Sequence, residues 1–519
     1  MKTVRFWLCG LMLGAAVSAP AQILNVHVTG GTVTGSADEG IAVFKGIPFA
    51  APPVGELRWK TPQPVKPWRG NNSATAFAPS CIQDELILKV FGGSPNISED
   101  CLYLNVWSPA KAPRERLPVM VWIYGGGFAL GSTGLPLYDG KKLAQRGVVL
   151  VSIAYRVGAL GFLAHPELTR EGHGASGNYG LGDQIAALKW VRDNIARFGG
   201  NPHNVTIFGE SAGGISVSML AASPLAHDLF QKAISESGGN FGPTRLTEAD
   251  GGLNMRSLAG AEAQGVAALR ESGTADIRAA RQLPAVDIQK LTGPMGRFWP
   301  DFDGRVLTGD QYRLYEAGRF NDTPILIGTN SDEGALFTPP KVTRDEFIQL
   351  IRSGYGEKAA AVLAAYPHAT DSEARQAQAD VFRDTAFALP TRTWANLHVG
   401  HGQGAVYSYY FDYKTAGDPN GSNHGDEMRF VFGNPAPPFV APADRDQQLT
   451  EQCMGYWTNF AKTGNPNGPG LPEWPRFTRE HPQVMSLGDK TGSMPIPHQE
   501  QLQVLDDYYA WRRAATEHR

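Results

Sequence analysis

Continuous runs of apolar residues recur along the chain at residues 119–124, 148–153, 205–208 and 324–327. None of the four runs shows the strict alternation of apolar and polar positions that marks a strand with one solvated face. A short run of this kind is typical of a strand that is covered on both faces of a sheet. The pattern therefore predicts four interior strands.

Between the second and third runs, residues 183–198 have a helical period. The apolar positions that share one face of this predicted helix are Ile185, Leu188, Val191 and Ile195. Strand, helix and strand in this order indicate a mostly parallel central sheet flanked by helices, which is an α/β fold. Residues 244–304 have irregular helical patterns rich in Ala and Gly, and we interpret them as an insertion packed above the sheet.

The first 21 residues have the organisation of a secretory signal peptide. Lys2 and Arg5 precede a mostly apolar run at residues 6–17, and residues 19–21 form a small-x-small cleavage site. The run is too short to span a bilayer, and the alternative is a buried N-terminal helix. We therefore expect residues 22–519 to form a single mature domain without a membrane span, in a secreted or periplasmic protein.

Composition excludes several classes of function. Of 519 residues, 42% are hydrophobic, and 47 basic against 50 acidic residues give a formal charge of −3. Nucleic acid and anionic membranes usually require a basic patch, so we expect no nucleic-acid partner. No Cys/His cluster has the spacing of metal ligands, so we expect no metal site. The oligomeric state stays open between a monomer and a weak homo-oligomer.

Cys81, Cys101 and Cys453 would remain after removal of the signal peptide. An oxidising compartment permits a disulfide, and a bond between the first two would close a short surface loop. The sequence alone does not prove this pairing. We interpret Cys453 as a small hydrophobic residue that is buried in the core.

The pentapeptide Gly-Glu-Ser-Ala-Gly at residues 209–213 directly follows the predicted strand at 205–208, and a helix-compatible run follows at 215–222. Gly-x-Ser-x-Gly between a strand and a helix is the pattern of a nucleophile elbow, a tight turn that presents a serine hydroxyl at the top of a sheet. The helix N-terminus beyond it favours developing negative charge. Ser211 is therefore the candidate nucleophile.

A glycine run, Gly125-Gly126-Gly127, follows the strand that ends at Tyr124. Such a run can direct backbone N–H groups into a cavity, where they stabilise the oxyanion of an acyl-transfer reaction. Taken alone, the run is also compatible with a flexible turn. Beside a nucleophile elbow, the oxyanion hole is the favoured interpretation.

In this arrangement the acid and then the histidine follow the serine along the chain. Asp332 and Glu333, just beyond the strand at 324–327, are both candidates for the acid. Position alone does not select the base, and loop chemistry favours His424 because Gly and Asn surround it. The histidines beyond residue 327 are His368, His398, His401, His424, His481, His498 and His518.

Several separate motifs together give the chain a family resemblance from about residue 26 to residue 509. They lie at residues 44–50, 52–53, 57–59, 98–105, 198–200, 209–213, 328–334, 424, 430–433 and 457–466. On these motifs the chain resembles the type-B carboxylesterase family, which includes cholinesterases and bacterial para-nitrobenzyl esterases. The resemblance implies the α/β-hydrolase fold.

The resemblance also implies roles for single residues. It makes Ser211 the nucleophile, His424 the general base and Glu333 the orienting acid, with Asp332 as a structural neighbour. The oxyanion hole would consist of the backbone N–H groups of Gly126, Gly127 and Ala212.

The same resemblance pairs Cys81 with Cys101 in a disulfide and Arg58 with Glu99 in a structural ion pair. Cys453 has no partner in the family pattern. The loop that the disulfide closes has no Trp or Tyr, so a cholinesterase-like site that stacks on a quaternary ammonium group is not expected.

The implied activity is that of a serine carboxylic-ester hydrolase, acting through an acyl-enzyme on a small-molecule ester and needing no cofactor. The alternatives are a specialised esterase for a charged or bulky natural ester, a lipase or amidase on the same scaffold, and a non-catalytic adhesion-type binding protein. The last is disfavoured because every triad position is present. An acidic substrate would need Arg or Lys near the site, and the candidates are Arg297 and Arg383, with a solvated surface charge as the alternative interpretation. The candidate pocket aromatics are Phe128, Phe298, Trp299 and Phe337, with core packing as the alternative for each.

Overall fold

The computed structural model describes residues 22–245, 254–274, 276–293, 296–415, 420–434 and 445–517. The predicted signal peptide, residues 1–21, lies outside the described residues. Among the described residues, no helix is both long and apolar enough to cross a membrane.

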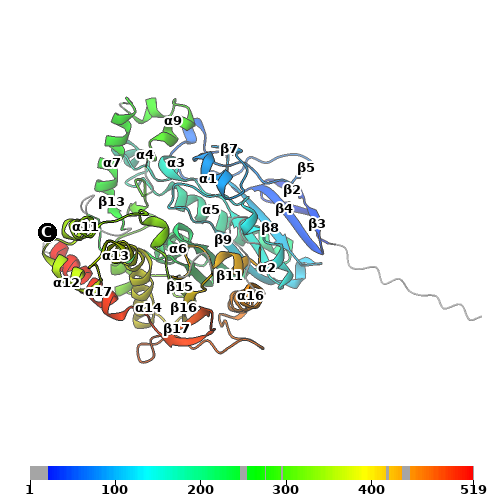
Figure 1. Ribbon diagram of the computed structural model, residues 1–519. Coiled ribbons are helices and arrows are strands. Elements are labelled where there is room, and N and C mark those ends of the chain that lie inside the picture. Colours follow the sequence, from blue (N-terminus) through cyan, green and yellow to red (C-terminus); the bar gives the residue numbers. More distant parts are fainter. Residues whose placement is uncertain are drawn as a thin grey trace, which may run out of the picture.

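A mixed sheet runs through the described part of the chain and has eleven strands (Figure 1). Seven adjacent strands in the middle of the sheet are parallel to one another, and the three strands beyond them at one end and the one strand at the other end pair antiparallel. In spatial order the strands are β18 (Gly492–Pro495), β17 (Gln483–Gly488), β16 (Val406–Asp412), β15 (Ile325–Asn330), β12 (Lys232–Glu236), β11 (Gly200–Glu210), β9 (Leu117–Ile123), β10 (Val149–Ile153), β8 (Tyr103–Ser108), β4 (Ile41–Pro48) and β3 (Ser36–Asp38).

The four predicted interior strands are β9, β10, β11 and β15, and each lies within the parallel part of the sheet. The residues of the four predicted runs are buried apart from Pro324, as expected of strands covered on both faces. The predicted helix at 183–198 is α5 (Tyr179–Asn194), which ends in a short 3₁₀ turn at Ile195–Phe198.

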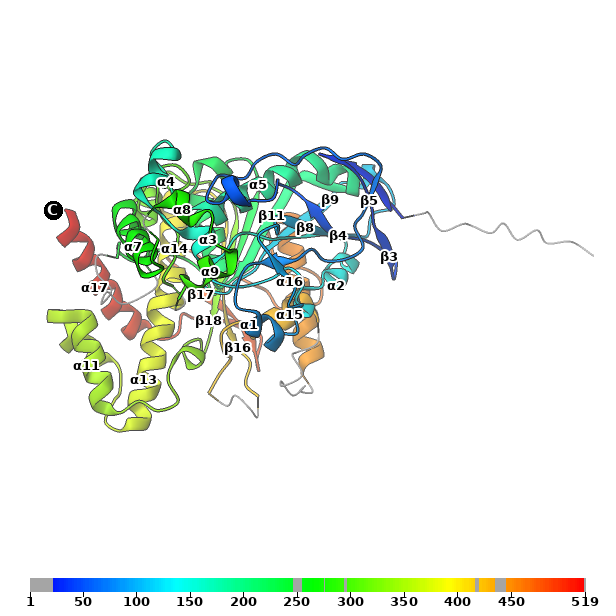
Figure 2. The ribbon, with the colours of Figure 1, turned by 90° about the horizontal axis from the view of Figure 1, so that it is seen from above.

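Helices cover both faces of the sheet. Figure 2 shows the strands β8, β9 and β11 between α5 on one side and α2 and α16 on the other. The helices are α1 (Glu85–Val90), α2 (Lys141–Gln145), α3 (Gly158–Phe162), α4 (Pro166–Glu171), α5, α6 (Ala212–Ala222), α7 (Leu258–Glu271), α8 (Ile277–Ala280), α9 (Ala285–Lys290), α10 (Gln311–Glu316), α11 (Arg344–Tyr355), α12 (Ala359–Ala365), α13 (Asp371–Arg383), α14 (Leu389–His401), α15 (Met428–Phe432), α16 (Asp446–Thr463) and α17 (Gln499–Glu517).

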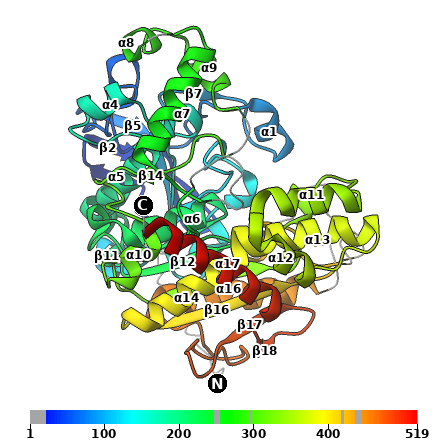
Figure 3. The same cartoon turned by 90° about the vertical axis from the view of Figure 1, so that its left-hand side faces the viewer.

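Residues 244–304, predicted to be an insertion, contribute α7, α8 and α9 and two short strands, β13 (Arg256–Ser257) and β14 (Asp301–Phe302), which pair outside the main sheet. In Figure 3 these helices gather at one end of the molecule, and α11, α12 and α13 lie at another. The second group packs with α17 around a hydrophobic cluster of its own, which includes Phe347, Val362 and Leu505. Small strands complete the N-terminal part, namely β1 (Asn25–Val28), β2 (Gly31–Thr34), β5 (Asn71–Ser73), β6 (Ser80–Cys81) and β7 (Ile97–Ser98).

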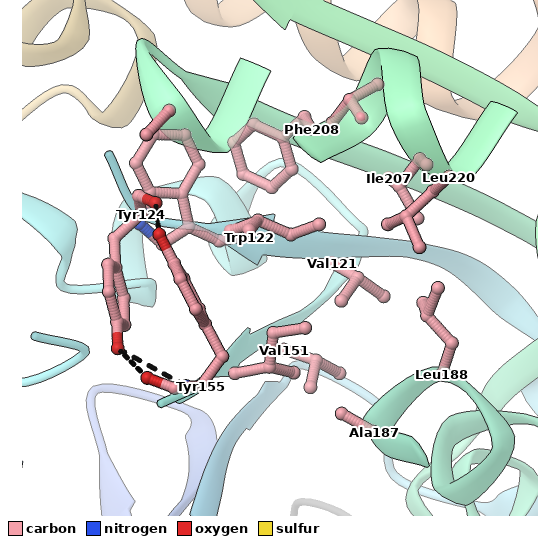
Figure 4. Close-up of a cluster of buried hydrophobic side chains, with 14 of the residues drawn as sticks. Val121, Trp122, Tyr124, Val151, Tyr155, Ala187, Leu188, Ile207, Phe208 and Leu220 are labelled. Atoms are coloured by element: carbon pink, nitrogen blue, oxygen red, sulfur yellow. Dashed lines mark hydrogen bonds between the residues drawn. The ribbon is translucent and has the colours of Figure 1, made fainter. Parts of the chain in front are cut away.

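The core beneath the parallel strands fixes the chain where β9 and β10 end (Figure 4). The rings of Tyr124 and Tyr155 stack with their centroids 4.4 Å apart. Each hydroxyl donates a hydrogen bond to the backbone carbonyl of the other residue, at 2.9 and 2.8 Å. Because Tyr124 directly precedes the glycine run, this pair anchors the start of the candidate oxyanion loop.

A disulfide joins Cys81 to Cys101, the pair that the family resemblance implied. Beside it, Arg58 forms a two-pronged ion pair with Glu99, at 2.8 and 2.7 Å. Both side chains are largely buried, and the planar guanidinium satisfies both carboxylate oxygens. Cys453 is a buried free thiol, which confirms its interpretation as a buried small hydrophobic residue.

Candidate active site

Ser211 lies at a strained turn between β11 and α6. Its backbone has φ 56° and ψ −125°, a conformation that costs energy for a residue with a side chain. The turn is held by a hydrogen bond from the Ser211 N–H to the carbonyl of Glu236, at 2.9 Å. It is also closed by the first bond of α6, from the Ile215 N–H to the Ser211 carbonyl, at 2.8 Å.

The glycines on either side of the serine allow close contact between backbones. A Cβ atom on Gly213 would lie 2.0 Å from the carbonyl oxygen of Ile123, and one on Gly209 would lie 2.6 Å from Gly213. No side chain fits at either distance. The motif Gly-x-Ser-x-Gly is therefore required by the packing of the turn against β9.

The glycine run at 125–127 passes directly beside the serine. A Cβ atom on Gly125 would lie 2.9 Å from the Cβ of Ser211, and Gly126 and Gly127 both have positive φ, at 102° and 59°. Within the described residues, the N–H groups of Gly126, Gly127 and Ala212 donate no hydrogen bond to the protein. The structure thus brings three unused donors close to the candidate nucleophile.

Glu333 and His424 meet on the other side of the site, although 91 residues separate them in sequence. The imidazole Nδ1 lies 2.5 Å from Glu333 Oε2. The other carboxylate oxygen accepts hydrogen bonds from the Ser237 hydroxyl and the Asn330 N–H, at 2.5 and 2.7 Å. Glu333 is fully buried, so these three contacts fix its carboxylate.

Asp332, the alternative acid, does not reach the imidazole in the described structure. Its N–H donates to the carbonyl of Ser422 at 2.9 Å, which ties the acid loop to the histidine loop. Burial raises the pKa of its side chain. Of the two candidate acids, Glu333 is the one that contacts His424.

A second carboxylate faces the histidine from the elbow itself. Glu210 Oε1 lies 3.1 Å from His424 Nε2. These two atoms do not form a hydrogen bond, and the Ser211 hydroxyl has no hydrogen bond to another described residue, so Nε2 has no hydrogen-bond partner within the described part of the chain. Glu210 occupies a variable position of the motif Gly-x-Ser-x-Gly. Neither Glu210 nor Ser237 was predicted from the sequence to belong to the site.

The two carboxylates determine the titration of the histidine. Burial lowers the pKa of His424, but the charges of Glu210 and Glu333 outweigh burial and raise this pKa to about 9. Burial raises the pKa of Glu210 to about 7, against the opposing effect of the imidazole. The two carboxylates therefore stabilise the imidazolium that forms when His424 takes up a proton.

Two further buried glutamates lie near the elbow. Burial raises the pKa of Glu236 to about 8, although the Trp457 indole N–H donates to its carboxylate at 2.9 Å. Burial also raises the pKa of Glu427 well above its usual range, and the Asn330 amide donates to it at 2.5 Å. Because neither carboxylate has a cation partner among the described residues, both favour their protonated forms.

The residues predicted to line a pocket have varied environments. Phe337 meets the His424 ring edge-on, at 5.2 Å between centroids. Phe128 and Trp299 pack on each other at 4.7 Å, and Phe128 is fully buried. Phe298 is also buried.

The arginines suggested for an acidic substrate are already paired. Arg383 is buried and bound to Asp384 and Asp380, both at 2.8 Å, so it is not the solvated charge that was the alternative interpretation. Arg297 pairs with Glu271 at 2.6 Å. Among the described residues, no group of His, Cys, Asp and Glu is arranged to hold a metal ion.

Comparison with known proteins relates this geometry to a family. The model of the carboxylesterase family matches residues 21–505. The chain is 38% identical to the fumonisin B1 esterase of Sphingopyxis macrogoltabida, over 93% of this chain and 90% of that protein. It is 37% identical to the para-nitrobenzyl esterase of Bacillus subtilis (strain 168), over 92% and 97%.

Solved structures give the same result. A PNB esterase superposes with a TM-score of 0.80 at 35% identity, covering 93% of this chain and all of that one. A thermophilic PNB esterase superposes with a TM-score of 0.83 at 34% identity and the same coverage. The chain therefore belongs to the carboxylesterase family of carboxylic-ester hydrolases, and it has the α/β-hydrolase fold.

Proposed function

We propose that Ser211, His424 and Glu333 form the catalytic triad of this esterase, with the N–H groups of Gly126, Gly127 and Ala212 as its oxyanion hole. The observation that carries the proposal is the 2.5 Å contact between His424 Nδ1 and a fully buried Glu333, beside a serine on a strained elbow. A carboxylate in this position holds the imidazole in one tautomer and stabilises the imidazolium.

The reaction follows from these roles. The imidazole of His424 accepts the Ser211 hydroxyl proton through Nε2, while the serine oxygen attacks the ester carbonyl. The three free N–H groups stabilise the resulting oxyanion. His424 then donates the proton to the departing alcohol. The same imidazole afterwards accepts a proton from water, which hydrolyses the acyl-enzyme.

The substrate is a small-molecule carboxylic ester, and a specialised natural ester is the second candidate. The second candidate is supported by the 38% identity to a fumonisin B1 esterase over most of both chains. The disulfide between Cys81 and Cys101 supports an oxidising location, as in a secreted or periplasmic protein.

Hydrolysis of para-nitrophenyl esters from acetate to laurate tests the proposal. We expect the Ser211→Ala variant to lose roughly 10⁶-fold in kcat, because the nucleophile is lost. Ser218→Ala is the matched control, since this hydroxyl lies on the same helix and donates only to the Ile215 carbonyl, at 2.7 Å. Wild-type activity in a folded Ser211→Ala variant would show that another residue is the nucleophile.

A further inference from the structure

A phenyl ring from a distant helix stacks on the imidazole of His424. The ring centroids of Phe387 and His424 are 4.5 Å apart, and the ring planes differ by 25°. Phe387 is 1% exposed, so the contact excludes water from this face of the imidazole. Phe337 approaches at an angle of 64°, so among the described residues Phe387 makes the stacked contact.

Phe387 lies in a π-helical turn, Asp384–Ala388, which joins α13 to α14 without a break. The turn is closed by a hydrogen bond from the Leu389 N–H to the Asp384 carbonyl, five residues earlier. Pro390 follows, and a proline inside a helix lacks an N–H and clashes with the carbonyl four residues before it. The extra residue of the π-turn accommodates this proline and rotates the side chains of the turn relative to α13.

Buried polar contacts hold the turn in place. Asp384 is fully buried and accepts hydrogen bonds from Arg383 Nε and from the Tyr366 hydroxyl, both at 2.8 Å. The Thr385 hydroxyl donates to the Val381 carbonyl at 2.7 Å. A π-turn with a charged pair at its base is a costly feature, and such turns are frequent at functional sites.

We propose that Phe387 is a positioning residue, which fixes the plane of the His424 ring and stabilises the imidazolium that forms at each proton transfer. A phenyl face carries partial negative charge, so a stacked cation is attracted to it, most strongly where water is excluded. The inference rests on the proposed role of His424 as the general base.

Other charges also face the imidazole. Glu333 and Glu210 contact its two nitrogens, and Asp426 on the same loop adds to their effect. Arg383 and Asp384, at the base of the π-turn, are paired with each other. A change of Phe387 to an aliphatic residue leaves all these charges in place, so its effect on titration isolates the ring.

The test compares Phe387→Leu with Phe382→Leu. Phe382 belongs to the same aromatic cluster and packs on Phe337 and Phe387, but it makes no ring contact with His424. We expect Phe387→Leu to lower kcat for para-nitrophenyl acetate about tenfold with little change in KM, and to move the acidic limb of the pH profile down by about one unit. Phe382→Leu should leave that limb unchanged.

Identical kcat values and pH profiles for the two leucine variants would overturn the inference. If Phe387→Leu does not fold, incorporation of 3,4,5-trifluorophenylalanine at position 387 replaces it, because fluorine withdraws the negative charge of the ring face and largely keeps its shape. An unshifted acidic limb in the fluorinated enzyme would also overturn the inference. A His424→Ala variant that remains active would instead refute the proposed triad, so the two failures are distinguishable.

Discussion

His424 and His398 are both buried histidines beside a carboxylate, yet their pKa values shift in opposite directions. Burial lowers the pKa of His398 to about 4, whereas neighbouring carboxylates raise that of His424 to about 9. Aromatic rings pack on both imidazoles, Phe320 on His398 at 5.3 Å and Phe387 on His424 at 4.5 Å. Burial therefore does not distinguish the two regions, although the ring planes differ by 46° at His398 and by 25° in the stacked contact at His424.

The two histidines differ in the number and distance of the neighbouring carboxylates and in the other hydrogen bonds that these carboxylates accept. His424 has a carboxylate oxygen at each nitrogen, at 2.5 and 3.1 Å. His398 has Asp322 at 3.4 Å, and this carboxylate already accepts hydrogen bonds from the N–H groups of Gln403 and Gly404. A carboxylate that already accepts hydrogen bonds from other donors stabilises a nearby imidazolium less than a carboxylate without them. The number and closeness of the carboxylates therefore account for the opposite directions of the two pKa shifts.

The strongest way to break the comparison is Glu333→Gln, which removes the carboxylate at Nδ1. We expect kcat to fall about 10⁴-fold, because the imidazolium loses its closest countercharge and the imidazole can adopt the wrong tautomer. Steady-state hydrolysis of para-nitrophenyl butyrate measures this effect. Asp332→Asn is the control, and it should retain most of the activity. A Glu333→Gln variant with a tenth of wild-type activity would exclude the proposed role.

The second test concerns the neutral histidine. The folded-state pKa of His398 lies below its unfolded value of 6.5, so the unfolded chain binds the proton more readily. Stability is therefore present at neutral pH and is lost as the pH falls from about 6.5 towards 4, by about 3 kcal/mol at pH 4.

The variant His398→Leu removes this source of acid sensitivity. Urea unfolding at pH 7 and pH 4.5 should show a smaller difference in unfolding free energy than in the wild-type protein, by about 2 kcal/mol. His401→Leu is the control, because His401 lies three residues later on the same helix and is exposed. Equal acid sensitivity in His398→Leu and the wild-type protein would contradict a neutral buried His398.

Local sequence patterns predicted the strands and the tight turn around Ser211. The continuous apolar runs placed β9 and β11, and the glycines of the elbow are explained by contacts within that strand–turn–helix unit. The histidine side depends on contacts between distant segments. The Gly and Asn around His424 favoured it but did not select it, and only the fold brings Glu333 to His424 and Asp322 to His398.

The environments of Arg383 and Phe387, two residues near the site, depend on contacts that the sequence pattern does not predict. Arg383 was considered as a receptor for an acidic substrate, but α13 buries it against Asp384 and Asp380. Phe387 carried no signal, since its position depends on a π-turn next to Pro390 and on the packing of α13 and α14 against the histidine loop. Helical periodicity predicts a regular helix at this point, and a regular helix would turn the Phe387 side chain in a different direction from the π-turn.

The smallest of these effects, and the one that best sharpens the comparison, is expected for Glu210→Gln. The neutral amide keeps the shape of the side chain but no longer stabilises the imidazolium, so the pKa of His424 should fall towards that of an ordinary buried histidine. The acidic limb of kcat/KM should move down by about one pH unit, while Glu333 continues to orient the ring. Glu427→Gln is the matched control, because this buried carboxylate does not contact His424 in the described structure. If both variants shift the limb equally, the general negative charge of the buried glutamates governs the histidine. If only Glu210→Gln shifts the limb, the carboxylate near Nε2 governs the pKa of His424. The contrast with His398 then depends on a carboxylate in direct contact with the imidazole.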